Sequence, residues 1–138
     1  MESTENRVVQ ALKEQGLRVT PQRYAVYANL LQRTDHPTVD QLLTDLNQDF
    51  PVSSQATVYN SLNTLLEAGL IREVLLEEGV SRYDANTNPH HHFQCQRCGA
   101  IEDIPWQAFP KLDMGQLRPG LTPERYEVTV MGCCDRCQ

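Results

Sequence analysis

Four cysteines, arranged as two Cys-x-x-Cys pairs, are the residues of this chain best suited to metal chemistry. The first pair is Cys95 and Cys98, and the second is Cys134 and Cys137. A two-residue spacer lets both sulfurs of a pair reach one ion, and a closed tetrahedral zinc site needs four such ligands. The spacing therefore predicts a structural zinc site, with disulfides or unrelated free thiols as the alternatives.

Three consecutive histidines, His90, His91 and His92, precede the first cysteine pair. In an extended segment alternate side chains share a face, so His90 and His92 are expected on one face and His91 on the other. His90 and His92 are therefore candidate ligands of a second site, because imidazole with carboxylate suits iron, manganese or another borderline metal. A solvated histidine loop is the alternative.

The composition fits one globular domain or two small ones. The chain has 138 residues, a net charge of −6 and 40% hydrophobic residues, with no run near the roughly 20 apolar residues of a membrane span. Its start is polar rather than a secretory signal, so a cytoplasmic protein is expected. Cys133, the fifth cysteine, is expected to be a small buried residue, with an alternative ligand or a redox-active thiol left open. The negative charge argues against generic nucleic-acid affinity, so any DNA binding must come from a local surface.

The first half of the chain has the pattern of a winged helix-turn-helix. Periodicity and capping residues predict helices over residues 6–15, about 21–33, 39 to the Phe50-Pro51 break, and about 55–68. Thr20, Thr38 and Ser53-Ser54 are the expected caps. Apolar runs at 70–76 and 80–83, around the turn Glu77-Glu78-Gly79, predict a hairpin that forms the wing. A protein-interaction module built from the same elements is the alternative.

The last of these helices is expected to present a neutral polar surface. Outside its apolar stripe it carries only small, hydrogen-bonding or aromatic residues, namely Gln55, Ala56, Thr57, Tyr59, Asn60 and Asn63. Such a surface can enter a DNA groove without repelling the phosphates.

The second half is expected to form a small α/β domain that can pair with a copy of itself. Residues 86–89 are polar, end in proline and predict a linker. Short strands are predicted at 93–95, 100–104 and 126–131, with a short helix at 109–117. The fold class is therefore α+β, with domains at residues 1–85 and 90–138 joined by the linker at 86–89.

Taken together, the motifs resemble the ferric uptake regulator family of metal-sensing repressors over nearly the whole chain. The segments that carry the resemblance are Arg18-Val19-Thr20-Pro21-Gln22-Arg23, His36-Pro37-Thr38, Ser54-Gln55-Ala56-Thr57-Val58-Tyr59-Asn60-Ser61-Leu62, Ser81-Arg82-Tyr83-Asp84, His90 to Gly99, and Cys134 to Cys137. The resemblance implies an N-terminal winged helix-turn-helix DNA-binding domain and a C-terminal dimerisation domain. It also implies a homodimer that binds palindromic AT-rich operators in double-stranded DNA when its regulatory metal is bound.

The resemblance further implies roles for single residues. Structural Zn²⁺ would be held by Cys95, Cys98, Cys134 and Cys137. Regulatory Fe²⁺ or Mn²⁺ would be held by His36, Asp84, His90, His92 and Asp103. The DNA-contacting surface would include Arg18, Arg23, Ser54, Gln55, Thr57, Tyr59 and Asn60. Metal binding would fix the relative orientation of the two domains, and so the spacing of two reading helices in a dimer.

Asp103 indicates the peroxide-sensing branch of this family, in which the ligand at that position is typically aspartate, whereas the iron-sensing branch commonly has glutamate. That branch implies that iron-catalysed oxidation of His36 or His90 releases the DNA. Glu102 adjoins Asp103, and a shift of one residue would favour an iron sensor or another metal sensor. The segment 112–123 departs from the family pattern, because glycines and prolines stand where a longer dimerisation helix is usual.

Three other functions fit parts of the sequence. Two Cys-x-x-Cys knuckles can hold one iron as in rubredoxin-like electron carriers, although the helices and His36 then have no role. A zinc hydrolase needs an open coordination position and a general base, and the sequence has no His-Glu-x-x-His motif. The third is a DNA-binding protein with structural zinc and no sensing. The function predicted is a regulator that is not an enzyme.

Overall fold

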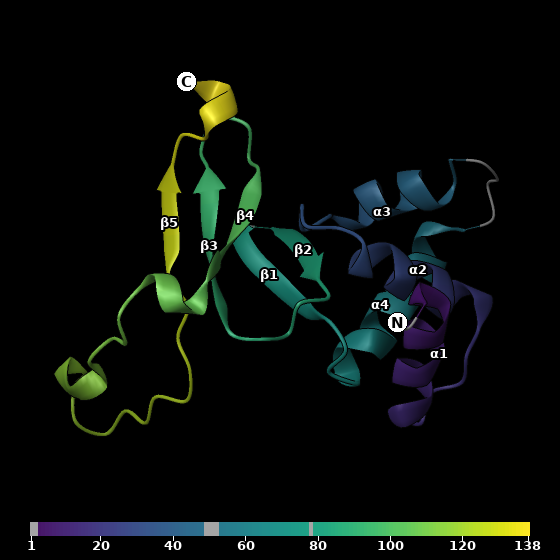
Figure 1. The fold of residues 1–138 in the computed structure, drawn as a ribbon, viewed down its shortest axis with the longest axis horizontal. Helices are drawn as coiled ribbons and strands as arrows, with labels where there is room; N and C mark the ends of the chain where they lie inside the picture. Colours follow the sequence, from purple (N-terminus) through teal and green to yellow (C-terminus); the bar gives the residue numbers. More distant parts are fainter. Residues whose placement is uncertain (1–2, 49–52, 78) are drawn as a thin grey trace. The chain divides into compact units, whose positions relative to one another are not determined.

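The computed structural model describes residues 3–48, 53–77 and 79–138, which form two compact units. The first unit is Met1–Thr87 and the second is Asn88–Gln138. Helices and a hairpin make up the first, and a small sheet makes up the second (Figure 1). The predicted α+β class and the winged-helix arrangement of the first half are therefore confirmed.

Four helices open the described part of the first unit, and each is preceded by a residue whose hydroxyl group caps it. They are α1 (Thr4–Glu14), α2 (Pro21–Leu31), α3 (Val39–Leu46) and α4 (Gln55–Glu67). The hydroxyls of Ser3, Thr20, Thr38 and Ser54 accept hydrogen bonds from N–H groups of the first turns. Helix α3 ends at Leu46, and the predicted break at Phe50-Pro51 lies outside the described residues. Among the described residues, none of the helices combines the length and apolarity that crossing a bilayer requires.

The cap of α3 provides a direct test of how local sequence stabilises this unit. Thr38 Oγ1 accepts from Gln41 N–H at 3.3 Å, and Gln41 Oε1 accepts from Thr38 N–H at 2.9 Å. Thr38→Ala removes the first of these bonds, so we expect it to lower the free energy of unfolding by about 1 kcal/mol in urea titrations. Thr44→Ala, at an exposed position within the same helix, is the matched control and should be neutral or slightly stabilising. Equal losses for both variants would contradict the capping role.

The apolar faces of the helices meet in one core, which fixes the direction in which α4 faces. The buried members are Val8, Leu12, Val26, Tyr27, Leu30, Val39, Leu42, Val58, Leu62, Leu65, Ile71 and Tyr83. Because Val58, Leu62 and Leu65 of α4 point into this core, the helix presents its polar residues to solvent.

Strands β1 (Arg72–Glu77) and β2 (Val80–Asp84) form the antiparallel hairpin that follows α4. The first strand begins two residues later than predicted, because Ile71 is drawn into the helical core. In the predicted turn, Glu78 lies outside the described residues, and Gly79 has a φ of 76°. Because Arg72 pairs with Asp84, the end of β2 lies beside the start of β1.

The second unit is a three-stranded sheet in the order β4-β3-β5 (Figure 1). Its strands are β3 (His90–Cys95), β4 (Ile101–Pro105) and β5 (Thr129–Gly132). Strand β3 pairs antiparallel with β4 and parallel with β5. It begins at His90 rather than at the predicted Phe93, so the three histidines lie within a strand.

The prediction of a helix at residues 109–117 is wrong. In residues 88–138, all of which the structure describes, the helical elements are the short 3₁₀ turns η1 (Trp106–Ala108), η2 (Met114–Gln116) and η3 (Asp135–Cys137). Asp113 Oδ1 accepts from Gly115 N–H at 2.8 Å, a local bond that competes with helix formation. Strand β5 is also shorter than the predicted 126–131. Figure 1 shows that a long open segment of the chain, rather than a helix, connects β4 to β5.

Candidate metal centres and nucleic-acid interface

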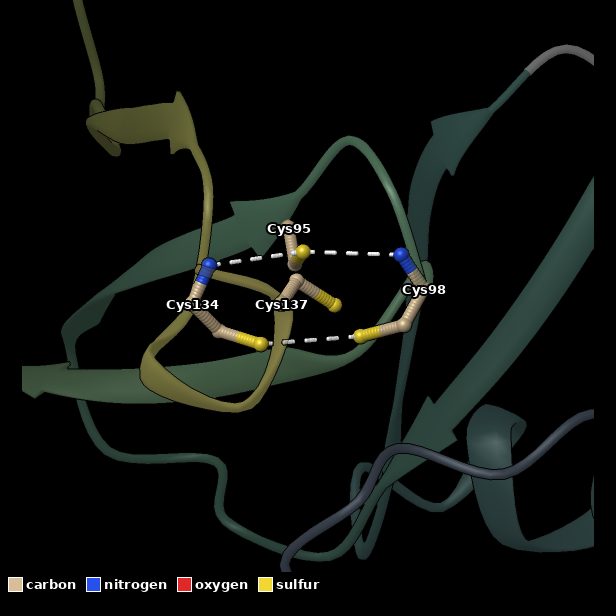
Figure 2. Close-up of side chains that lie close together, drawn as sticks. All are labelled: Cys95, Cys98, Cys134 and Cys137. Carbon is tan, nitrogen blue, oxygen red and sulfur yellow. Dashed lines mark hydrogen bonds between the residues drawn. The ribbon is translucent and has the colours of Figure 1, made fainter.

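The four predicted zinc ligands come together at one end of the sheet. Cys95 ends β3, Cys98 follows on the tight knuckle before Gly99, and Cys134 and Cys137 follow β5. Figure 2 shows all four side chains turned toward a common centre, and their sulfur atoms lie within 4.8 Å of one another. The Sγ atoms of Cys98 and Cys134 are 3.7 Å apart. Two pairs far apart in sequence thus form one compact set of sulfur donors.

Backbone N–H groups stabilise the thiolate form of Cys95. Its sulfur accepts from the N–H groups of Cys98 at 3.5 Å and Cys134 at 3.4 Å (Figure 2), and from Arg97 at 3.4 Å. These hydrogen bonds, led by that of Cys98, lower the pKa of Cys95 to about 5. Thiol hydrogen bonds with Cys134 and Cys98 instead raise the pKa of Cys137 to about 12. Metal ligation by cysteine requires the thiolate form, so these hydrogen bonds to the Cys95 sulfur favour the form that binds a cation.

Cys133 is not part of the four-sulfur set within the described residues. Its thiol donates to the carbonyl of Cys134 at 3.6 Å, and burial raises its pKa. A half-buried thiol of raised pKa resembles the small packing residue expected from the sequence.

A second donor set lies on the β3–β4 pair of the same unit. The Nε2 atoms of His90 and His92 lie 3.2 Å and 3.5 Å from Asp103 Oδ1, and the two rings are 4.6 Å apart. The Nδ1–H of His90 donates to the Asn88 carbonyl at 2.6 Å, so its Nε2 lone pair is left to face a metal. Two imidazoles and one carboxylate therefore converge.

Register decides which of the two adjacent carboxylates joins this set. Asp103 pairs with His92 across the β3–β4 ladder, whereas Glu102 pairs with Phe93. Because neighbouring residues of a strand point to opposite faces, Glu102 projects away from the two histidines. The sequence alone could not separate these two acids.

His36 and Asp84 form a third donor group, within the first unit. His36 Nε2 lies 3.3 Å from Asp84 Oδ2, and His36 is the described non-glycine residue with a positive φ, 55°. Arg82 donates to the His36 carbonyl at 3.2 Å, and Tyr83 N–H donates to the Pro37 carbonyl at 3.0 Å. These bonds hold the loop on β2 at a strain of about 1 kcal/mol, which is typical of functional sites. Sequence reasoning gave Arg82 no role, although it stands in the Ser81-Arg82-Tyr83-Asp84 motif.

The predicted DNA-contacting residues gather around the start of α4 and the start of α2. Tyr59 is 42% exposed, and Gln55 and Asn60 are also exposed. Ser54 Oγ bonds Thr57 Oγ1 at 2.8 Å and so is committed to the start of the helix. Arg23, Thr57 and Asn60 line a polar hollow of about 210 Å³. The Arg23 guanidinium donates to the carbonyl of Arg18 at 2.9 Å, which joins the two arginines.

Comparison with known proteins agrees with these observations. The profile described as "Ferric uptake regulator family" matches residues 14–129. The peroxide-responsive repressor PerR of Staphylococcus aureus is 32% identical over 131 residues, which cover 94% of this chain and 88% of that protein. The structure of the Campylobacter jejuni peroxide stress regulator superposes with a TM-score of 0.67 at 31% identity, covering 99% of this chain and 100% of the other.

The Helicobacter pylori ferric uptake regulator has the same fold, with a TM-score of 0.70 at 20% identity over 99% of this chain and 94% of the other. The family match accounts for the helices, which an electron carrier would leave without a role. The chain belongs to the ferric uptake regulator family of metal-responsive transcriptional regulators and is not an enzyme.

Proposed function

We propose that this protein is a metal-dependent DNA-binding repressor that senses peroxide through Fe(II)-catalysed oxidation of histidine. The observation that carries the proposal is the position of Asp103 beside His90 and His92 on the β3–β4 pair. An aspartate in this position is typical of the peroxide-sensing branch. The relatives named as peroxide regulators, at 32% and 31% identity, support the same branch.

The donor chemistry supports two different metals. Four sulfurs within 4.8 Å of one another suit Zn²⁺ in a closed tetrahedral site, which serves structure rather than reactivity. Imidazole and carboxylate donors suit Fe²⁺ or Mn²⁺. We therefore assign zinc to the cysteine set and the regulatory metal to the histidine–aspartate residues.

The regulatory site is proposed to take ligands from both units, His36 and Asp84 from the first and His90, His92 and Asp103 from the second. Each group alone offers few donors, and each is already arranged by its own strand or loop. Shared ligands would tie the orientation of the two units to metal occupancy, since a metal stabilises the arrangement that it binds best. Occupancy would in turn set the spacing of the two reading helices in a dimer.

The oxidation-sensitive residues are proposed to be His36 and His90. Fe(II) held by these residues would supply the redox chemistry that cleaves the O–O bond of hydrogen peroxide. In the net reaction, one peroxide oxygen would be inserted at a ring C–H of a neighbouring imidazole and the other would leave as water. Within each donor group, Asp84 lies 3.3 Å from His36 and Asp103 lies 3.2 Å from His90, so both rings are held with Nε2 toward the carboxylate. An oxidised ring is a poorer donor, and its loss would release the metal and then the DNA.

The DNA-binding surface is proposed to comprise the exposed face of α4 with Arg18 and Arg23. The net charge is −6, so affinity must come from this local surface rather than from the overall field. Asn60 and Gln55 carry amides able to pair with adenine, and Tyr59 offers an apolar ring for a thymine methyl group. Two copies of the chain would read a palindromic, AT-rich operator.

Intact mass measurement tests the sensing step. The protein is loaded anaerobically with Fe(II), treated with one equivalent of peroxide, and compared with a Mn(II)-loaded control. We expect a gain of one oxygen atom, located by peptide mapping at His36 or His90, in the Fe(II) sample alone.

Two other outcomes would each direct the assignment elsewhere. Metal-dependent DNA binding without histidine oxidation would make the protein an iron or manganese sensor. DNA binding unaffected by Fe(II) and Mn(II) would leave a regulator with structural zinc alone.

A further inference from the structure

We propose that His91 is a positioning residue that fixes the register of β5 on β3 and so delivers the second cysteine pair to the metal site. It is the histidine of the triplet that neither candidate centre uses. His91 faces away from His90 and His92 and is only 1% exposed. The part of the inference that concerns zinc rests on the proposed structural site.

The ring of His91 anchors the residue that immediately precedes β5. Val128 N–H donates to His91 Nδ1 at 2.9 Å, and the Val128 carbonyl accepts from His92 N–H at 3.0 Å. Both backbone groups of Val128 are thus bound by neighbouring residues of β3. An acceptor at Nδ1 also fixes the His91 tautomer with its proton on Nε2.

Aromatic side chains hold that ring in place. Trp106 stacks on His91 with centroids 4.5 Å apart and an interplanar angle of 17°, and Phe109 and Tyr126 lie at 5.2 Å and 6.2 Å. Trp106 and Tyr126 also contact each other at 5.0 Å, and Tyr126 Oη accepts from Leu112 N–H at 3.0 Å. His91 therefore anchors both ends of the open segment between β4 and β5.

Strand β5 is short, and at its far end the Gln96 N–H donates to the Gly132 carbonyl at 2.8 Å, so His91 fixes the end that enters the sheet. The strand spans only Thr129–Gly132 and is paired on β3 alone, with His92↔Thr129 and Cys95↔Gly132 as the end pairs. A slip of two residues keeps every side chain on its face but moves the strand by about 6.6 Å. The sulfurs of the cluster lie within 4.8 Å of one another, so Cys134 and Cys137 would then miss the site.

Two substitutions separate the hydrogen bond from the stacking. His91→Phe keeps a flat ring against Trp106 but removes the acceptor, whereas His91→Asn keeps an acceptor at the place of Nδ1 and removes the ring. Zinc transfer from the full-length holoprotein to an excess of chelator is the readout. Trp106, the single tryptophan, reports through its emission whether stacking is lost.

The acceptor is expected to decide zinc retention. His91→Phe should release zinc about tenfold faster than wild type, as for one buried donor left without a partner. His91→Asn should stay within about twofold while its Trp106 emission shifts, because its acceptor is kept. If His91→Phe released zinc at the wild-type rate, or if both variants released it equally fast, the inference would be overturned.

A measurement on the unmodified protein covers the case in which a variant fails to fold. Hydrogen exchange should show the Val128 amide protected to the same degree as that of His92. Exchange of Val128 at the rate of an exposed amide would overturn the inference by itself. If the wild-type protein held no zinc, the proposal of a structural zinc site would be refuted. The hydrogen-exchange result would still test whether His91 anchors Val128.

Discussion

Replacing Cys98 with serine is expected to remove zinc from the protein and to unfold residues 88–138. This unit is small, and its sheet has only three strands, one of them four residues long. Units of this size seldom bury enough apolar surface to be stable without a metal or disulfides. Structural zinc sites contribute about 10 kcal/mol or more to folding, so loss of one thiolate should exceed the stability of the unit.

Zinc content by elemental mass spectrometry and thermal unfolding by circular dichroism measure the effect. The transition of the second unit should disappear, while that of the helical unit remains, because its core is built from its own residues. Cys133→Ser is the matched control, since Cys133 adjoins Cys134 but lies outside the sulfur set. Full zinc content in Cys98→Ser, or loss of zinc in Cys133→Ser, would show that the ligands are assigned wrongly.

The parts of the fold that were predicted correctly depend on short-range interactions. Thr20, Thr38 and Ser54 each cap a helix through an N–H group three residues away, so the signal lies within one turn of sequence. The alternation of the histidine triplet depends only on an extended backbone. The two Cys-x-x-Cys motifs predicted the sulfur set because the spacer itself places each pair.

The parts that were predicted wrongly or missed depend on distant partners. The segment at 109–117 has residues that allow a helix, but Asp113 caps a short turn, and Tyr126 binds the backbone of Leu112 from across the open segment between β4 and β5. His36 adopts its positive φ in a loop whose carbonyl, that of His36 itself, accepts a hydrogen bond from Arg82, 46 residues away in the sequence. No local pattern reports such contacts, and the same holds for the role proposed for His91.

Asp103→Asn is expected to abolish high-affinity Mn²⁺ binding at the regulatory site, and with it metal-dependent DNA binding. Asp103 Oδ1 lies within 3.5 Å of both His90 and His92, so it is the anionic donor shared by the pair. Loss of a group that only orients a ligand typically weakens metal affinity by 10–100-fold, roughly speaking. Loss of a charged ligand should therefore cost at least about a hundredfold. Mn²⁺ affinity by calorimetry, and operator binding by fluorescence anisotropy at fixed salt, measure the two effects.

Glu102→Gln is the control that separates register from charge. It removes the same single charge one residue away, on the face of β4 that pairs with Phe93 rather than with His92. Because its side chain points away from the histidines, Mn²⁺ affinity should stay within about twofold of wild type, as expected for an exposed charge in salt. A large loss in Glu102→Gln with little change in Asp103→Asn would mean that glutamate is the ligand and that the protein is an iron sensor. Loss of zinc in either variant would place the effect at the sulfur set, whereas unchanged zinc confines it to the regulatory metal.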